Sequence, residues 1–130
     1  MKKYPDNFQK AVTWLKKSMN IDVQLSQMTC FMGHSSRKIF IHHNYNLEKN
    51  GLYALLHELG HALQPEDKTG PNHYKNIDED DNPKLYNMYQ FMNELDAWNR
   101  GYEISKLIGV DIDEKIFNKC KQEALLTYYV

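Results

Sequence analysis

An H-E-L-G-H motif at residues 57–61 lies within the apolar run 52–63 and constrains the fold more than any other segment. A run that is apolar on nearly all sides is typical of a helix buried in a protein core. On such a helix His57 and His61 are four positions apart, so both side chains project from the same face. Buried polar side chains need partners, and one metal ion would satisfy both imidazoles. The run therefore predicts a core helix that carries a metal site.

Glu58 directly follows the first histidine and lies beside the face that the histidines share. From there its carboxylate can reach a metal-bound water without binding the metal itself. Two imidazoles suit zinc, and a neighbouring carboxylate provides the base that a zinc-activated water needs. H-E-x-x-H is a short pattern, and the alternative is a surface helix with two solvated histidines. The apolar neighbours of the motif favour the buried metal site.

A catalytic zinc site has three protein ligands and one open position. Glu94 is the main candidate for the third ligand, because it lies on a later predicted helix with Ala97 and Gly101 on the same face. Small side chains let two helices approach closely, as a glutamate must to reach a metal on the neighbouring helix. A glycine within a helix costs about 1 kcal/mol relative to alanine, and close packing is a reason to tolerate it.

At these two motifs the chain resembles the gluzincin branch of the zincin metallopeptidases, in which a glutamate on a downstream helix is the third zinc ligand. Residues 55–63 are similar to the active-site helix of that family, and residues 93–98 are similar to its glutamate helix. Small bacterial and phage peptidases akin to the ImmA/IrrE group share the same small set of structural elements. The resemblance covers residues 37–107. It implies a zincin-like fold and a zinc-dependent hydrolase, and it does not identify a substrate.

Two other candidates for the third ligand remain open. Asp67 lies at the distance from His57 at which metzincin-type peptidases place their third ligand. In that pattern a glycine allows a sharp turn, but this chain has Gln64 there, followed by Pro65. His73 is the second candidate, although a histidine in a loop is more often solvated.

A peptidase also needs a neutral donor that helps the zinc to stabilise the oxyanion of the transition state. Four side chains in or beside the segment that precedes Glu94 are candidates: His73, Tyr74, Tyr86 and Tyr89. Their spacing does not choose among them, since tyrosines also serve as amphipathic packing residues. Tyr89 fits the core equally well.

Two further features lie near the predicted site. His42 and His43 end a predicted strand, whose edge could pair with an extended peptide, although a solvent-facing strand end is the simpler interpretation. Asp96 is a candidate for orienting a zinc-binding histidine, but its position on the helix turns it away from Glu94.

The rest of the pattern predicts a single α+β domain over residues 1–130, with a helix first, then a small antiparallel sheet, the active-site helix and two C-terminal helices. Asn46 or Asn50 is expected to cap the active-site helix, and the polar segment 65–82 is expected to be a long loop that is either a lid or a plain linker. The expected bounds are 5–19, 83–107 and 113–128 for the other helices, and 21–31 and 37–43 for a hairpin of two strands.

Composition narrows the partners of the chain. A length of 130 residues suits one domain with a modest core, and a formal charge of −1 shows no bulk attraction to nucleic acid or to a membrane. No window approaches the roughly 20 apolar residues of a membrane span, and residues 1–7 do not begin a signal peptide. We therefore expect a cytoplasmic protein in which Cys30 and Cys120 are reduced, buried thiols.

These features predict a zinc metallopeptidase, most simply an endopeptidase that acts on a protein or peptide in the same cell. Glu58 is expected to take a proton as the zinc-activated water attacks a carbonyl carbon, and to deliver that proton to the leaving amine. One alternative is a zinc-binding regulatory or interaction protein that keeps the zincin frame without turnover, but a purely structural site would not need Glu58. A second alternative is a zinc hydrolase that acts on a non-peptide amide. The oligomeric state stays open.

Overall fold

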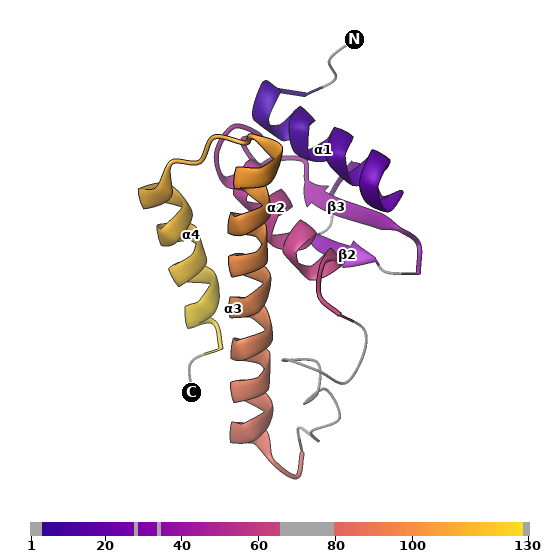
Figure 1. Ribbon diagram of the computed structural model, residues 1–130. Coiled ribbons are helices and arrows are strands. Elements are labelled where there is room, and N and C mark those ends of the chain that lie inside the picture. The colour runs from indigo at the N-terminus through magenta and orange to yellow at the C-terminus, as the bar shows by residue number, and fades with distance from the viewer. Residues whose placement is uncertain (1–3, 28, 34, 66–79, 129–130) are drawn as a thin grey trace.

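One helix and three short strands come first in the chain, and three further helices follow them (Figure 1). The computed structural model describes residues 4–27, 29–33, 35–65 and 80–128. Within these residues the predicted α+β class is confirmed. The elements are α1 (Asp6–Met19), β1 (Asp22–Ser26), β2 (Phe31–Gly33), β3 (Lys38–His42), α2 (Asn50–Ala62), α3 (Pro83–Ile108) and α4 (Glu114–Leu126).

The sheet is mixed, in the order β1-β3-β2. Strand β3 is parallel to β1, with Val23 opposite Ile39, and antiparallel to β2, with Phe31 opposite Phe40. The expectation of a purely antiparallel hairpin was therefore wrong, because two strands, β1 and β2, precede β3 in the chain and lie on its opposite sides. Strand β3 is the central strand. Its alternating side chains bury Ile39 and Ile41 completely, whereas β1 and β2 contain no buried residue.

Helix α2 is the centre of the core. It contacts α1, β2, β3, α3 and α4 (Figure 1). Its apolar side chains join one cluster with the buried faces of α1 and β3, and the members from these three elements are Phe8, Ala11, Leu15, Ile39, Ile41, Leu52, Tyr53, Leu55, Leu56 and Leu59. The prediction that the motif lies on a core helix is confirmed, because the run supplies apolar side chains to almost every face.

The ends of α3 agree with the sequence, while the start of α2 differs from the cap that was expected. Pro83 opens α3, and Gly109 closes it with a φ of 76°, a left-handed conformation that suits glycine. Lys49 occupies the N-cap position of α2, so the prediction of a cap by Asn46 or Asn50 was wrong. Both asparagines instead hold the preceding turn: Asn46 Oδ1 accepts from the amide of Glu48, and Asn50 Oδ1 accepts from the amide of Asn46, each at 2.9 Å.

Helix α4 also differs from its expected bounds. The side chain of Asp113 caps it by accepting hydrogen bonds from the amides of Lys115 and Ile116. The helix ends at Leu126, so Tyr128 lies in the turn beyond it rather than on it. Residues 66–79, which include most of the predicted loop, lie outside the described residues.

Two further expectations, about membrane-spanning helices and about the two cysteines, can be compared with the structure. Of the helices that the structure describes, none is long and apolar enough to cross a membrane. Cys30 and Cys120 are free and only partly buried, and desolvation raises the pKa of both thiols. A raised pKa keeps each thiol protonated and unreactive at neutral pH.

Candidate metal centre

Helices α2 and α3 touch through their backbones. A Cβ placed on Gly60 would lie 1.8 Å from the carbonyl oxygen of Ala97, and one placed on Gly101 would lie 2.2 Å from the carbonyl oxygen of Leu56. Only glycine fits at either position. The expected close approach at Ala97 and Gly101 is confirmed, and Gly60 is an additional contact that sequence reasoning missed. This packing brings Glu94 on α3 within reach of the motif on α2.

The three predicted ligands meet at one point. Oε2 of Glu94 lies 2.5 Å from Nε2 of His61 and 3.5 Å from Nε2 of His57. The three residues each offer one ligand atom, and these atoms lie within 4.8 Å of one another. All three side chains are mostly buried, with between 14% and 17% of their surface exposed. Two helices that are separated in the sequence therefore present two imidazoles and one carboxylate to the same space.

The donor atoms fit a metal ion better than they fit one another. Nε2 of His57 and Oε2 of Glu94 are buried and have no well-oriented hydrogen-bond partner among the described residues. A buried polar atom without a partner costs about 1–3 kcal/mol. Two imidazole nitrogens and one carboxylate oxygen are a common ligand set of catalytic zinc, which keeps its fourth position open. The residues present therefore suit zinc.

Comparison of the chain with protein-family models, with curated proteins and with solved structures finds no match.

Glu58 is buried beside the centre, with 5% of its surface exposed. Its Oε2 lies 3.3 Å from Nδ1 of His57, on the ring nitrogen that does not face Glu94. The carboxylate is thus close to the three ligand residues without joining their converging atoms. This location allows Glu58 to orient the ring of His57, and its role as a general base stays a prediction.

A relay of side chains from α3 orients His61. Nε2 of Gln64 donates hydrogen bonds to the carbonyl of Asn93 at 2.8 Å and to Oδ2 of Asp96 at 3.0 Å, and Nε of Arg100 donates to the same carboxylate at 2.7 Å. The amide oxygen of Gln64 therefore faces His61 and accepts from its Nδ1 at 2.9 Å. This tautomer leaves Nε2 of His61 free to bind a metal. Asp96 acts on the histidine through Gln64, which sequence reasoning had not considered as its intermediary.

The ring of His57 is held by an aromatic side chain. It stacks on Trp98 with the ring centroids 4.5 Å apart and the planes 9° from parallel. Trp98 in turn packs edge-on against Phe117 of α4, at 5.4 Å. The three helices that surround the centre thus fix its first histidine before any ligand arrives.

The charges at the centre stabilise one another in the absence of metal. Burial disfavours the imidazolium of His57, but the carboxylates of Glu58 and Glu94 outweigh it and raise the pKa of His57 to about 9. Burial also disfavours the imidazolium of His61, and Glu94 again raises the pKa. Burial would raise the pKa of Glu94, but its close contacts with both histidines hold that pKa well below its usual range. Protons therefore occupy the site where a metal would bind.

Zinc affinity is expected to rise by at least about tenfold per pH unit up to about pH 9, more steeply at the lower pH values where His61 also carries a proton, and then to level off. Below that pH zinc must displace a proton from His57, and above it the ring is already neutral. Competition with a chelator of known protonation constants, measured from about pH 6.5 to about pH 9.5, tests this dependence. A zinc affinity that does not change across this range would contradict it.

The structure does not test the roles that were predicted for the other candidate site residues. Asp67, His73 and Tyr74 are outside the described residues. Tyr86 and Tyr89 lie on α3 before Glu94, and Tyr89 is buried, with its pKa raised by desolvation and by the charges of Tyr86 and Glu94. Their role as oxyanion donors stays a prediction.

His42 and His43 stack on each other where β3 ends, with their ring centroids 5.0 Å apart. Nδ1 of His42 accepts a hydrogen bond from the amide of Asn44 at 3.1 Å. His43 is exposed. These contacts agree with the simpler interpretation of a solvent-facing strand end.

Sequence reasoning missed one side chain at the centre. The hydroxyl of Tyr128 lies 3.1 Å from Oε1 of Glu94, across 34 positions of the chain. Desolvation, the charge of Glu94 and this hydrogen bond raise the pKa of Tyr128 to about 12, so the neutral phenol donates and the carboxylate accepts. No motif or periodicity connects two residues at this spacing, and only the packing of α4 on α3 brings them together.

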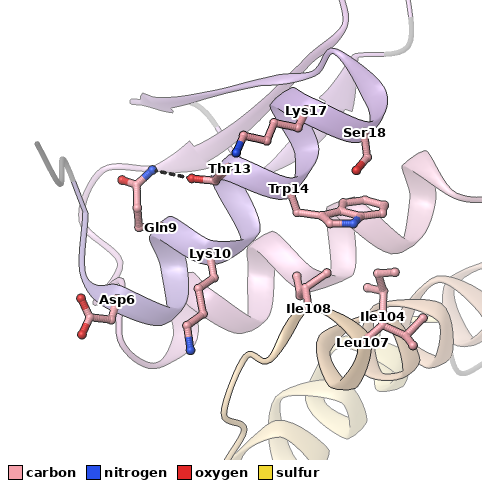
Figure 2. A pocket seen from close by; sticks show the side chains of 10 residues that line it. All are labelled: Asp6, Gln9, Lys10, Thr13, Trp14, Lys17, Ser18, Ile104, Leu107 and Ile108. Atoms are coloured by element: carbon pink, nitrogen blue, oxygen red, sulfur yellow. Dashed lines mark hydrogen bonds between the residues drawn. The ribbon is translucent and has the colours of Figure 1, made fainter.

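Two of the hollows that the described residues line have a similar volume but differ in their relation to the centre. A hollow of about 720 Å³ lies between α1 and the C-terminal end of α3, where Trp14 faces Ile104, Leu107 and Ile108 (Figure 2). None of its lining residues belongs to the centre. A groove of about 730 Å³ between α3 and α4 is lined in part by Tyr128, whose hydroxyl contacts Glu94, although none of the candidate metal ligands lines it.

Proposed function

We propose that the chain is a zinc metallopeptidase of the zincin type, with His57, His61 and Glu94 as zinc ligands and Glu58 as the general base. The observation that carries this proposal is the convergence of two imidazoles and a carboxylate beside a buried glutamate. Such a set of residues is more than a structural site requires. A structural zinc site is closed by four protein ligands, whereas three ligands leave a position for a reactant.

Bound zinc would polarise the carbonyl of the substrate and acidify a water molecule. The chain supplies the movement of protons. Glu58 takes the proton of the water as its oxygen attacks the carbonyl carbon, and then delivers that proton to the nitrogen of the leaving amine. Gln64 keeps the ring of His61 in the required tautomer, and Trp98 keeps the ring of His57 in place. A donor for the oxyanion is still needed, and His73, Tyr74, Tyr86 and Tyr89 stay the candidates.

The groove between α3 and α4 supports a peptide with apolar side chains as the substrate. Four of its lining residues expose large apolar side chains: Met88, Phe91, Met92 and Leu126. Apolar walls with a few polar groups are typical of ligand sites, and the groove adjoins the centre at Tyr128. A cytoplasmic location, with a protein or peptide of the same cell as substrate, remains part of the proposal.

The zinc content of Glu94→Ala tests the ligand set. Wild-type protein is expected to hold about one zinc per chain, since the described part of the chain offers one such centre. The variant should lose most of it after dialysis against a weak chelator, because only two ligands remain. Elemental mass spectrometry measures both. The matched control is Glu103→Ala, which removes an exposed glutamate from the same helix.

Two outcomes would contradict parts of this scheme. If Glu94→Ala keeps the zinc content of wild type, the third ligand would instead be Asp67 or His73. A wild-type protein that holds no zinc even when zinc is supplied would contradict the proposal of a zinc enzyme. A binding domain would then be the better explanation of the chain.

One observation favours a second function at the same centre. The carboxylate of Glu58 contacts Nδ1 of His57, so it could serve only to orient a ligand. The chain would then be a zinc-binding regulatory or interaction protein without turnover. Substitution of Glu58 separates the two functions, because a base and an orienting group fail in different ways.

A further inference from the structure

Tyr128 connects the turn after α4 to the metal centre. Backbone hydrogen bonds from Tyr128 to Leu125 at 3.1 Å and from Thr127 to Ala124 at 3.3 Å form this turn. The hydroxyl of Thr127 strengthens it by donating to the carbonyl of Ala124 at 2.7 Å. The turn lies against the middle of α3, where the C-terminal end of α4 comes alongside (Figure 1). The tyrosine is therefore held at the position from which its hydroxyl reaches Glu94.

The two oxygens of Glu94 have different partners. Oε2 faces Nε2 of His57 and of His61, while Oε1 accepts the hydrogen bond of Tyr128 at 3.1 Å. A glutamate side chain has three rotatable bonds, and free rotation would spread its carboxylate over several positions. The hydrogen bond to Oε1 selects the rotamer in which Oε2 points at the histidines.

We propose that Tyr128 is a positioning residue that holds Glu94 as a one-oxygen zinc ligand. This inference rests on the zinc binding proposed above. It makes the turn after α4 part of the metal centre, in addition to α2 and α3. Groups that hydrogen-bond to a metal ligand are typically worth 10- to 100-fold in metal affinity.

The zinc affinity of Tyr128→Phe tests this role. Phenylalanine keeps the ring against the groove wall that Leu125 and Leu126 share, and it removes only the hydroxyl. We expect zinc affinity, measured by chelator competition, to fall by about 10- to 100-fold. The matched control is Tyr102→Phe, which removes a hydroxyl that also hydrogen-bonds a carboxylate between α3 and α4, that of Glu114. This control should bind zinc within about twofold of wild type, since Tyr102 does not touch the centre.

A double-mutant cycle distinguishes positioning from a general effect on the fold. If Tyr128 acts through Glu94, the Tyr128→Phe change should have no further effect on zinc affinity in a Glu94→Ala background. A weak chelator keeps the low affinities of these variants measurable.

Three results would overturn the inference. Unchanged zinc affinity in Tyr128→Phe, with zinc bound by wild type, would overturn this role alone and leave the proposed function standing. The same loss in the Glu94→Ala background would show that the tyrosine acts by another route. A wild-type protein that binds no zinc would overturn the proposed function itself, and this inference with it.

Discussion

Glu58→Gln is expected to lower the rate of peptide hydrolysis by about 10²- to 10⁴-fold while zinc stays bound. Glutamine matches the size of glutamate in a position that is only 5% exposed, so the packing of α2 is preserved. Its amide cannot take a proton from water, and the proton transfer is lost. A quenched fluorescent peptide library with apolar residues measures cleavage, and elemental mass spectrometry measures zinc in the same samples.

Glu103→Gln on the exposed face of α3 is the control for this experiment, and it should cleave as wild type does. Undiminished cleavage by Glu58→Gln would contradict the role of Glu58 as base. If wild-type protein binds zinc but cleaves nothing, and Glu58→Gln binds zinc more weakly, the contact with His57 at 3.3 Å is the function of the carboxylate. That result would favour the regulatory alternative over the enzyme.

Gly60→Ala is expected to destabilise the metal-free protein by about 3 kcal/mol or more, which lowers the thermal midpoint by about 10 °C. The added methyl would lie 1.8 Å from the carbonyl oxygen of Ala97 and 2.7 Å from its carbonyl carbon. Both atoms belong to the backbone, so the clash can be relieved only by moving α3 away from α2. Alanine would otherwise favour the helix by about 1 kcal/mol, so the observed loss understates the clash. Thermal and denaturant unfolding measure the change.

Gly109→Ala provides the comparison. This glycine has a φ of 76° and nothing within 4 Å of its hypothetical Cβ, so alanine there tests the left-handed conformation alone, at about 1–2 kcal/mol. The Gly60 variant should also bind zinc more weakly, because a displaced α3 moves Glu94 away from the histidines. A Gly60→Ala protein as stable as wild type would contradict the close approach of the two helices.

The parts of the site that sequence could predict are those that follow from local periodicity. The apolar run around residues 57–61 required a buried helix, and the spacing of its histidines required a shared face. The small residues Ala97 and Gly101 beside Glu94 predicted where a second helix would come close. Each inference depends on residues within one helix, where geometry is nearly independent of the rest of the chain.

The parts that sequence could not predict depend on contacts between elements. Strand β1 lacks a clean alternation of buried and exposed residues, so nothing local indicated its parallel pairing with β3. Gly60 stands at a position of the motif that accepts any residue, and its role appears only when α3 is placed against it. Gln64 and Tyr128 reach the centre through contacts that no spacing rule describes.

The division of the ligands between α2 and α3 has a thermodynamic consequence. His61 and Glu94 belong to different helices, so their side chains meet only when the chain is folded, and an unfolded chain offers no comparable site. On the proposed zinc binding, the metal therefore stabilises the native state by mass action, by about 2.7 kcal/mol when free zinc is a hundredfold above the dissociation constant. The supply of zinc in the cell would then control how much of the protein persists in folded form, as well as how fast it works.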